Sequence, residues 1–256
     1  MKKIIIIKKF LTFFIRPIYR HILNHKFEYI SSIDYAMRYN EREKMLQDAM
    51  NFTADAKTGG DYLEFGVASG NSFISAYHLA KIAKLDSMKF YAFDSFEGLP
   101  EIRGKDNDGQ CNFKKGQFVC NLEKFETNLI DKKVDMLKVK IIKGWYKDTL
   151  KKKYSIKRVS VVWVDCDLYE STVFVLDFIK DYITEGSIII FDDWHCFKSN
   201  PNKGEQRAFW EWKKNNPDIE LVHYKKFGWR GNSFLVQYKP HNSTKEGRGK
   251  ASHQAH

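Results

Sequence analysis

Two pairs of aspartates are the residues of this sequence that are best suited to chemistry. Asp165 and Asp167 come at the end of one short apolar run, and Asp192 and Asp193 come at the end of another. Short apolar runs between polar residues are typical of buried strands in a parallel sheet. If these strands are neighbours, up to four negative charges converge where the strands end. Such a cluster requires either a cation or protons that are held at a raised pKa.

The residue types in this cluster favour a hard metal ion. Because side chains alternate along a strand, we expect Asp165 and Asp167 to point to the same side and Cys166 to point away. Oxygen ligands, with no Cys or His among the core members, suit Mg²⁺ or a similar divalent cation. In the alternative interpretation, two of the four aspartates cap helices and the other two are solvated.

A second group of polar residues follows an earlier apolar run and is suited to a cofactor. The segment 64–70 reads Glu-Phe-Gly-Val-Ala-Ser-Gly. Its two glycines allow the backbone to approach a ligand and to turn into a helix, whose N-terminal N–H groups favour an anion. Ala68 stands where the dinucleotide motif G-x-G-x-x-G has its second glycine, which argues against NAD.

Two acids complete this second group. Asp94 ends the next apolar run, at a position where an acid accepts the hydroxyl groups of a ribose. Glu64 ends the earlier run and is placed to hold an ammonium group. A site for an amino group, a carboxylate and a ribose together indicates S-adenosylmethionine. In the alternative interpretation, Asp94 caps the turn or helix that begins at Ser95.

Strand-like and helix-like segments alternate along the chain. The expected strands cover residues 61–66, 89–95, 139–144, 159–165, 187–193, 219–224 and 232–238. The expected helices cover residues 71–84, 121–129, 171–183 and 205–214, and the polar region 98–116 is expected to pass over the sheet as a long loop. The pattern predicts an α/β fold with a doubly wound, Rossmann-like sheet and an antiparallel C-terminal hairpin. Ligands of such sheets bind beyond the carboxyl ends of the strands, where all the polar motifs fall.

Taken in order, these motifs resemble the macrocin O-methyltransferase family. The resemblance rests on EFGVASGNS (64–72), FDSFEGLP (93–100), KGWYKDTL (143–150), DCDLYEST (165–172) and Asp192-Asp193, and it covers roughly residues 35–238. Members of this family methylate sugar hydroxyls of macrolide antibiotics and related compounds, using S-adenosylmethionine and Mg²⁺. Lys151 departs from the family pattern, which has proline there, and the loop 103–120 matches poorly, so the acceptor stays open.

The resemblance implies a role for each motif residue. Asp165, Asp192 and Asp193 would be the metal ligands, and Asp167 would be the general base. Met37 and Arg42 match the N-terminal segment that covers the cofactor in the family. The expected cofactor-binding residues are Met37, Glu64, Gly66, Ala68, Ser69, Gly70, Ser72, Asp94, Ser95, Gly144, Trp145 and Asp165.

Three further residues have two interpretations each. His195, two residues after the second aspartate pair, is a rival base or metal ligand, or else an exposed loop residue. Trp145 and Tyr146 either flank the adenine of the cofactor or belong to the core.

The implied reaction agrees with the chemistry of these residues. A sugar hydroxyl is weakly acidic and must lose its proton as it attacks the methyl group. A metal at the aspartates would polarise and orient that hydroxyl, and Asp167 would take the proton.

The charge of the chain is concentrated at its ends. The net charge is +11, but residues 1–27 hold seven basic residues and no acid, and residues 239–256 hold four basic residues and one acid. Residues 28–238 therefore carry only +1, which argues against nucleic-acid binding by the folded body. We expect a basic, apolar segment over 1–34, one methyltransferase domain over 35–238 and a disordered tail over 239–256.

The N-terminal segment contains apolar runs that are too short for a membrane span of about 20 residues. It also lacks the unbroken apolar core and cleavage site of a signal peptide. Residues 1–27 are expected to pack on their own domain or on a second subunit, or else to attach to anionic lipid. Four cysteines without C-x-x-C spacing indicate reduced thiols, hence a cytoplasmic protein, free or peripheral at the inner membrane face.

Three hypotheses of function follow. The leading one is an O-methyltransferase for a sugar hydroxyl of a glycan or glycosylated natural product. The second is an O-methyltransferase for catechol-like vicinal diols, which needs the same ion but a flat apolar pocket. The third is a non-catalytic protein of the membrane surface with a degenerate nucleotide fold. The intact acidic cluster counts against the third, because such a protein has no need of four convergent charges.

Overall fold

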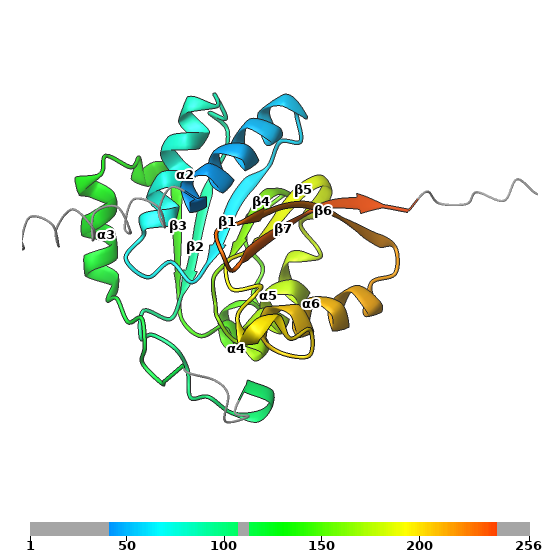
Figure 1. Ribbon diagram of the computed structural model, residues 1–256. Helices are drawn as coiled ribbons and strands as arrows, with labels where there is room; N and C mark the ends of the chain where they lie inside the picture. The colour runs from blue at the N-terminus through cyan, green and yellow to red at the C-terminus, as the bar shows by residue number, and fades with distance from the viewer. Residues whose placement is uncertain (1–40, 107–112, 240–256) are drawn as a thin grey trace, which may run out of the picture.

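The computed structural model describes residues 41–106 and 113–239, and a single seven-stranded sheet forms its centre (Figure 1). The order of the strands is β3-β2-β1-β4-β5-β7-β6. Their bounds are Asp61–Phe65 (β1), Phe90–Asp94 (β2), Val139–Lys143 (β3), Val159–Val164 (β4), Ile183–Phe191 (β5), Ile219–Phe227 (β6) and Gly231–Tyr238 (β7). Strands β1 to β5 are parallel, and β7 runs antiparallel to both β5 and β6. The predicted doubly wound sheet with an antiparallel C-terminal hairpin is confirmed.

Helices cover both faces of the sheet. Because side chains alternate along the strands, the strands contribute buried residues to both helical layers. One layer contains a helix over residues 41–55, α2 (Asn71–Ile82) and α3 (Leu122–Asp131). The other contains α5 (Tyr169–Ile179) and α6 (Gly204–Asn215), and α4 (Tyr146–Thr149) is a single turn after β3. In β4, Trp163 is buried in the first layer and the flanking valines are buried in the second. Figure 1 shows the two layers on either side of the strands.

Some boundaries differ from the sequence prediction. The helix over residues 41–55 was not predicted, although its buried Met45, Leu46, Ala49 and Met50 follow helical spacing. Strand β5 begins four residues earlier than expected, because Glu185 and Gly186 interrupt its apolar pattern. Strand β6 continues to Phe227, so the connection of the hairpin is shorter than predicted.

The strand order creates one crevice at the carboxyl edge of the sheet. The chain proceeds from β1 outward to β2 and β3, and then crosses back to β4 on the other side of β1. Loops leave the carboxyl ends of β1 and β4 in opposite directions, and ligands of doubly wound sheets bind at this reversal. The described parts of the loop between β2 and α3 line the cavity at the same edge, as expected.

Several sequence expectations fall on residues outside the described ranges. These are the basic segment 1–34, the expected cofactor contact Met37, and the tail from residue 240. Among the described residues, no helix is both long and apolar enough to cross a membrane. Cys120, Cys166 and Cys196 are free thiols.

Candidate active site

A cavity of about 750 Å³ opens at the carboxyl edge of the sheet, beside β1, β2 and β4. Its size is that of a small-molecule binding site, for which about 300–1,000 Å³ is usual. The predicted residues that line it are Gly66, Ala68, Asp94, Ser95, Gly144, Trp145, Asp165 and Asp167. The cavity therefore unites the glycine-containing loop after β1 with the first aspartate pair.

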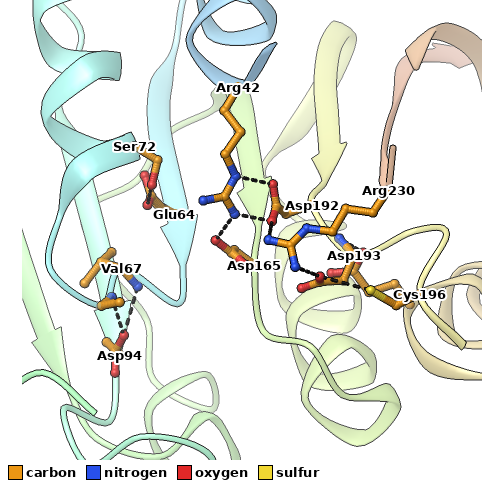
Figure 2. A network of polar contacts seen from close by, with 12 residues as sticks. Arg42, Glu64, Val67, Ser72, Asp94, Asp165, Asp192, Asp193, Cys196 and Arg230 are labelled. Atoms are coloured by element: carbon orange, nitrogen blue, oxygen red, sulfur yellow. Dashed lines mark hydrogen bonds and ion pairs between the residues drawn. The ribbon is translucent and has the colours of Figure 1, made fainter. Parts of the chain in front are cut away.

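The loop after β1 is held in place by Asp94. Oδ2 of this residue accepts hydrogen bonds from the backbone N–H groups of Val67 at 2.8 Å (Figure 2) and of Ala68 at 3.1 Å. Oδ1 accepts the N–H of Phe96 at 2.7 Å. Gly66 has a φ of 88°, and a Cβ there would collide with the carbonyl oxygen of Asp165, so the two loops meet only because this residue is glycine. Oδ1 of Asp94, with one donor, keeps a lone pair for a ligand in the cavity.

Glu64 lies behind the wall of the cavity and does not line it. Its Oε2 accepts the hydroxyl of Tyr62 at 2.5 Å, and its Oε1 accepts the hydroxyl of Ser72 at 2.6 Å. Burial raises the pKa of Glu64 to about 7. The structure thus pairs Glu64 with Ser72, so the expected contact with an ammonium group requires these bonds to rearrange. Ser69 and Gly70 also lie outside the lining.

The two aspartate pairs converge as predicted. Strands β4 and β5 are parallel neighbours and end at the same level, which brings Asp165, Asp192 and Asp193 together. One carboxylate oxygen from each of the three lies within 4.8 Å of the others. Asp192 and Asp193 are only 1% and 2% exposed. Burial, and after it the charge of Asp192, raises the pKa of Asp165 well above its usual value.

Two arginines neutralise this cluster, and sequence reasoning did not find this arrangement. Arg42, on the helix over residues 41–55, donates from Nε to Asp192 Oδ1 at 2.6 Å and from Nη2 to Asp165 Oδ2 at 2.8 Å, and Nη2 also contacts Asp192 Oδ2. Arg230 donates from Nη2 to Asp192 Oδ2 at 2.8 Å and pairs through Nη1 with Asp193 Oδ1 at 2.9 Å (Figure 2). The cluster therefore obtains positive charge from the chain itself.

Arg230 reaches the cluster because of the strand order. Strand β7 is antiparallel to β5 and pairs Asn232 with Phe191, so the turn before β7 lies beside the end of β5. Sequence spacing predicts a hairpin here, but it does not show that β7 rather than β6 is the neighbour of β5. That order could not be read from the motif pattern.

Asp167 lies beside the cluster, but not for the predicted reason. Strand β4 ends at Val164, and Asp167 has a φ of 60°, so strand alternation does not apply to it. Cys166 also belongs to the cavity lining, and its Sγ contacts the hydroxyl of Thr172 at 3.5 Å. Asp167 is 6% exposed and lines the cavity. Burial, followed by the facing charge of Asp193, raises its pKa well above the usual value.

Two buried carboxylate oxygens near the cluster have no hydrogen-bond donor among the described residues. They are Oδ2 of Asp193 and Oε1 of Glu205. The other oxygen of Glu205 accepts the backbone N–H of Asp193 at 3.0 Å and so fixes the second aspartate pair to the start of α6. Burial, and then the charge of Asp193, raises the pKa of Glu205 well above its usual value. A proton shared with Asp167 or a bound cation would satisfy Asp193.

The residues with two interpretations are separated by the structure. His195 does not line the cavity, and its Nδ1 contacts the hydroxyl of Ser199 at 2.7 Å. It is not part of the three-carboxylate group, so its geometry gives no support to a role as base or ligand. Trp145 lines the cavity and stays available to an adenine. Tyr146 also touches the cavity, but its ring packs against the buried Phe65 with 6.0 Å between centroids.

The loop after β2 forms the outer wall of the cavity and is fastened by an acid that the sequence did not reveal. The wall includes Leu99, Pro100, Glu101, Arg103, Asp106 and Phe118. Asp106, which is 4% exposed, accepts the N–H of Tyr169 at 2.8 Å and the N–H of Glu170 at 3.1 Å. These are the first two residues of α5, so the loop itself caps the helix that follows Asp167.

Comparisons with known proteins agree with this arrangement. The sequence model of the Macrocin-O-methyltransferase (TylF) family matches residues 25–230. An 8-demethyl-8-(2,3-dimethoxy-alpha-L-rhamnosyl)-tetracenomycin-C 4'-O-methyltransferase of Streptomyces olivaceus is 30% identical over 141 residues, which are 53% of either chain. The mycinamicin III 3''-O-methyltransferase of Micromonospora griseorubida is 27% identical over 141 residues, 53% of this chain and 55% of the other. The chain spans about half the length of the curated relatives it matches.

Solved structures share the fold. The O-methyltransferase NovP has a TM-score of 0.65 at 22% identity, and the alignment covers 76% of this chain and 79% of that one. The calicheamicin methyltransferase CalS11 has a TM-score of 0.58 at 19% identity, covering 75% and 77%. The family match extends over the glycine-containing loop, Asp94 and both aspartate pairs. This chain therefore belongs to the macrocin O-methyltransferase family.

Proposed function

We propose that this protein is an S-adenosylmethionine-dependent and divalent-cation-dependent O-methyltransferase that acts on a sugar hydroxyl of a glycan or glycosylated natural product. The domain that does this would cover residues 35–238. Family membership supports the proposal. The observation that carries it is one cavity that has the loop fixed by Asp94 on one side and the cluster around Asp165 on the other. The relatives with sugar-directed names support the acceptor class.

The cofactor would lie along the lining residues of the β1, β2 and β3 loops. Asp94 has one free lone pair, on Oδ1, for a ribose hydroxyl, and the backbone at Gly66 and Ala68 lines the cavity. Trp145 offers a flat surface for the adenine. Gly144 also lines the cavity and has a φ of 137°, a backbone conformation that favours glycine.

The acidic cluster fits a hard divalent cation. Three carboxylate oxygens lie close enough together to share one ion, and Asp193 has a buried oxygen that lacks a donor. The guanidinium groups of Arg42 and Arg230 occupy the other oxygens, so at least part of these contacts must give way to an ion. When bound, the cation would polarise the hydroxyl of the acceptor and make its proton easier to remove.

Asp167 is the residue of the cavity that is placed to receive that proton. Its carboxyl group lies beside the three-carboxylate group without being part of it. Burial raises its pKa well above the usual value, which makes its carboxylate a stronger proton acceptor than an exposed aspartate. In the transfer, the acceptor oxygen would bond to the methyl carbon while the bond from that carbon to sulfur breaks, and the hydroxyl proton would pass to Asp167.

The test is a methyl-transfer screen with labelled S-adenosylmethionine. Acceptors would include saccharides, nucleotide sugars, glycosylated natural products and catechols, each with and without Mg²⁺. We expect label on a saccharide-bearing acceptor. Label on catechols alone would favour the second hypothesis, and a folded protein that binds no cofactor would contradict the enzymatic proposal.

We further propose that residues 1–27 are dispensable for this chemistry, and that they pack on their own domain or on a second subunit or else make contact with anionic lipid. They carry seven basic residues, no acid and none of the motifs, and the family match begins only at residue 25. Sedimentation with anionic liposomes, with and without this segment, tests the contact. Binding should weaken sharply with salt, because exposed charges are screened within about 10 Å at 0.1 M ionic strength.

A further inference from the structure

Arg42 belongs to two sites at once. Its guanidinium bridges Asp165 and Asp192 of the acidic cluster, and its side chain also lines the cavity, where it is 32% exposed. Gly66 and Ala68, of the loop after β1, line the same cavity. Arg230, the other arginine of the cluster, also lines the cavity, but it bonds to Asp192 and Asp193 and not to Asp165.

A cation at the cluster and the guanidinium of Arg42 require the same oxygens. Arg42 contacts both carboxylate oxygens of Asp192 and also Oδ2 of Asp165, which are the groups that a divalent ion would need. Asp192 is only 1% exposed, so it has no free outer face on which a second cation could bind. Binding of the ion must therefore displace Arg42 from at least part of this contact.

The displaced charge needs a new partner within reach of the same helix. Met45, Leu46 and Ala49 are buried in the core, so the helix over residues 41–55 is fixed and the side chain of Arg42 must move alone. Glu64, another acid within electrostatic reach of Arg42, is already bonded to two hydroxyl groups. A partly buried guanidinium without an anion is unfavourable, and the open direction is the cavity beside Gly66.

We propose that Arg42 exchanges the aspartates for the amino-acid carboxylate of the cofactor when the metal binds. The metal and the carboxylate-bearing ligand would then bind cooperatively. The ligand's carboxylate would pair with the guanidinium that the metal displaces, and the metal would release that guanidinium from the aspartates for the ligand. This inference rests on the proposed function, since it takes S-adenosylmethionine as the ligand of the cavity. Arg42 is here a residue that binds the ligand and competes with the metal, and not a support for the metal ligands.

Isothermal titration calorimetry of the full chain tests the exchange with two probes. S-adenosylhomocysteine has the amino-acid carboxylate, and 5'-methylthioadenosine lacks it. For the unmodified protein we expect S-adenosylhomocysteine to raise the affinity for Mg²⁺ about tenfold, or about 1.4 kcal/mol. By thermodynamic reciprocity, Mg²⁺ should raise the affinity for S-adenosylhomocysteine by the same factor. 5'-Methylthioadenosine should bind without this coupling.

Substitution of Arg42 should change the affinity for Mg²⁺ in opposite directions, depending on whether Arg42 competes with the metal or supports the metal ligands. R42Q should bind Mg²⁺ more tightly than the unmodified protein in the absence of nucleoside, and its coupling to S-adenosylhomocysteine should be lost. R42K, which keeps the charge but not the fork, should lie between the two. R207Q is the matched control, because Arg207 also forms a partly exposed ion pair, with Glu211, outside the cavity lining. It should change neither affinity.

Each contrary result has a distinct meaning. Weaker Mg²⁺ binding by R42Q would overturn the inference, because Arg42 would then support the metal ligands. Equal coupling with both nucleosides, or none with either, would overturn it while leaving the proposed function intact. If neither nucleoside binds, both proposals fail together. If R42Q does not fold, the comparison of the two nucleosides on the unmodified protein still decides the question.

Discussion

Oδ2 of Asp94 accepts a hydrogen bond of 2.8 Å from the backbone N–H of Val67, and this bond joins the ends of two neighbouring strands. Asp94 therefore has two tasks in the proposed site. It shapes the loop that meets the cofactor, and it presents a lone pair of Oδ1 to the ribose. A substitution at this position changes both at once, since three backbone N–H groups lose their acceptor.

Replacement of Asp94 by Ala is expected to lower the affinity for S-adenosylhomocysteine at least tenfold, because hydrogen bonds to a charged group contribute about 1.5–3 kcal/mol each. Calorimetry measures this loss. The ribose contact is separated from the loop by a 2'-deoxy analogue of the ligand. The unmodified protein should discriminate against the analogue and D94A should not. Equal discrimination in both proteins would show that Asp94 acts on the loop alone.

Asp167→Asn is expected to lower the rate of methyl transfer by about 10²- to 10⁴-fold, the usual contribution of a general base. Binding of Mg²⁺ and cofactor should persist, because Asp167 lies outside the three-carboxylate group. The rate of the unmodified enzyme should rise with pH, since burial raises the pKa of Asp167 and the carboxyl group accepts a proton only after losing its own.

His195→Gln is the control for this assignment. The histidine does not line the cavity, so the rate should stay within about twofold, well below the effect of losing a base. A crippled H195Q together with an active D167N would reverse the two roles. Both are measured with the same labelled-methyl assay.

Removal of the divalent cation should abolish activity. Asp193→Ala deletes one of the three convergent carboxylates, so Mg²⁺ affinity should fall in calorimetry and excess Mg²⁺ should restore part of the rate. Asp177→Ala, at an exposed position on α5, is the matched control and should behave as the unmodified protein. Full activity after exhaustive chelation would show that the arginines alone are sufficient to neutralise the cluster.

Glu64→Gln is expected to change how stability depends on pH. The pKa of Glu64 is raised from 4.5 to about 7, so its contribution to stability is complete below pH 4.5 and is lost as the pH rises to about 7. Over this interval the group should remove about 3 kcal/mol from the free energy of unfolding, and the Gln variant should lack this loss. Urea unfolding at several pH values measures the difference, with E220Q on exposed β6 as the control.

Asp106→Ala should release the outer wall of the cavity. Loss of a helix cap costs about 0.5–2 kcal/mol, and here the cap also fastens the loop after β2 to the start of α5. Limited proteolysis should therefore show faster cleavage within residues 96–106. N121A is the matched control, because Asn121 caps α3 through Lys124 without belonging to the cavity wall. Equal cleavage rates in the two variants would contradict a fastening role.

The sequence was sufficient for those features that depend on local pattern. Apolar runs such as the one before Asp192 predicted the strands. The polar residues that follow these runs predicted the sheet edge at which the aspartates meet. The sequence did not show that Arg42 and Arg230 bind the aspartates. Arg42 is 123 residues from Asp165 and 150 from Asp192 in the chain, and Arg230 is 38 residues from Asp192. No local pattern encodes such contacts. The left-handed conformation of Asp167 was missed because strand alternation was assumed beyond the end of β4.

Some residues that look alike in the sequence are separated only by packing. Trp145 and Tyr146 are adjacent aromatic residues, yet the first is free to meet a ligand while the second packs on Phe65. Asp106 is one of several acids in a polar loop, and only its position above the first turn of α5 shows that it is a cap. Such distinctions depend on the distance between elements, which a single sequence does not contain.

The late position of β7 has a consequence for the growing chain on the ribosome. Both aspartate pairs are synthesised before the strand that carries Arg230 to them, and that strand must insert between β5 and β6. A nascent chain that ends after α6 holds buried carboxylates without one of their two counter-ions. Native packing of the cluster is therefore expected only after the final hairpin leaves the exit tunnel. A fragment over residues 41–216 should lack the near-ultraviolet circular dichroism of the full chain.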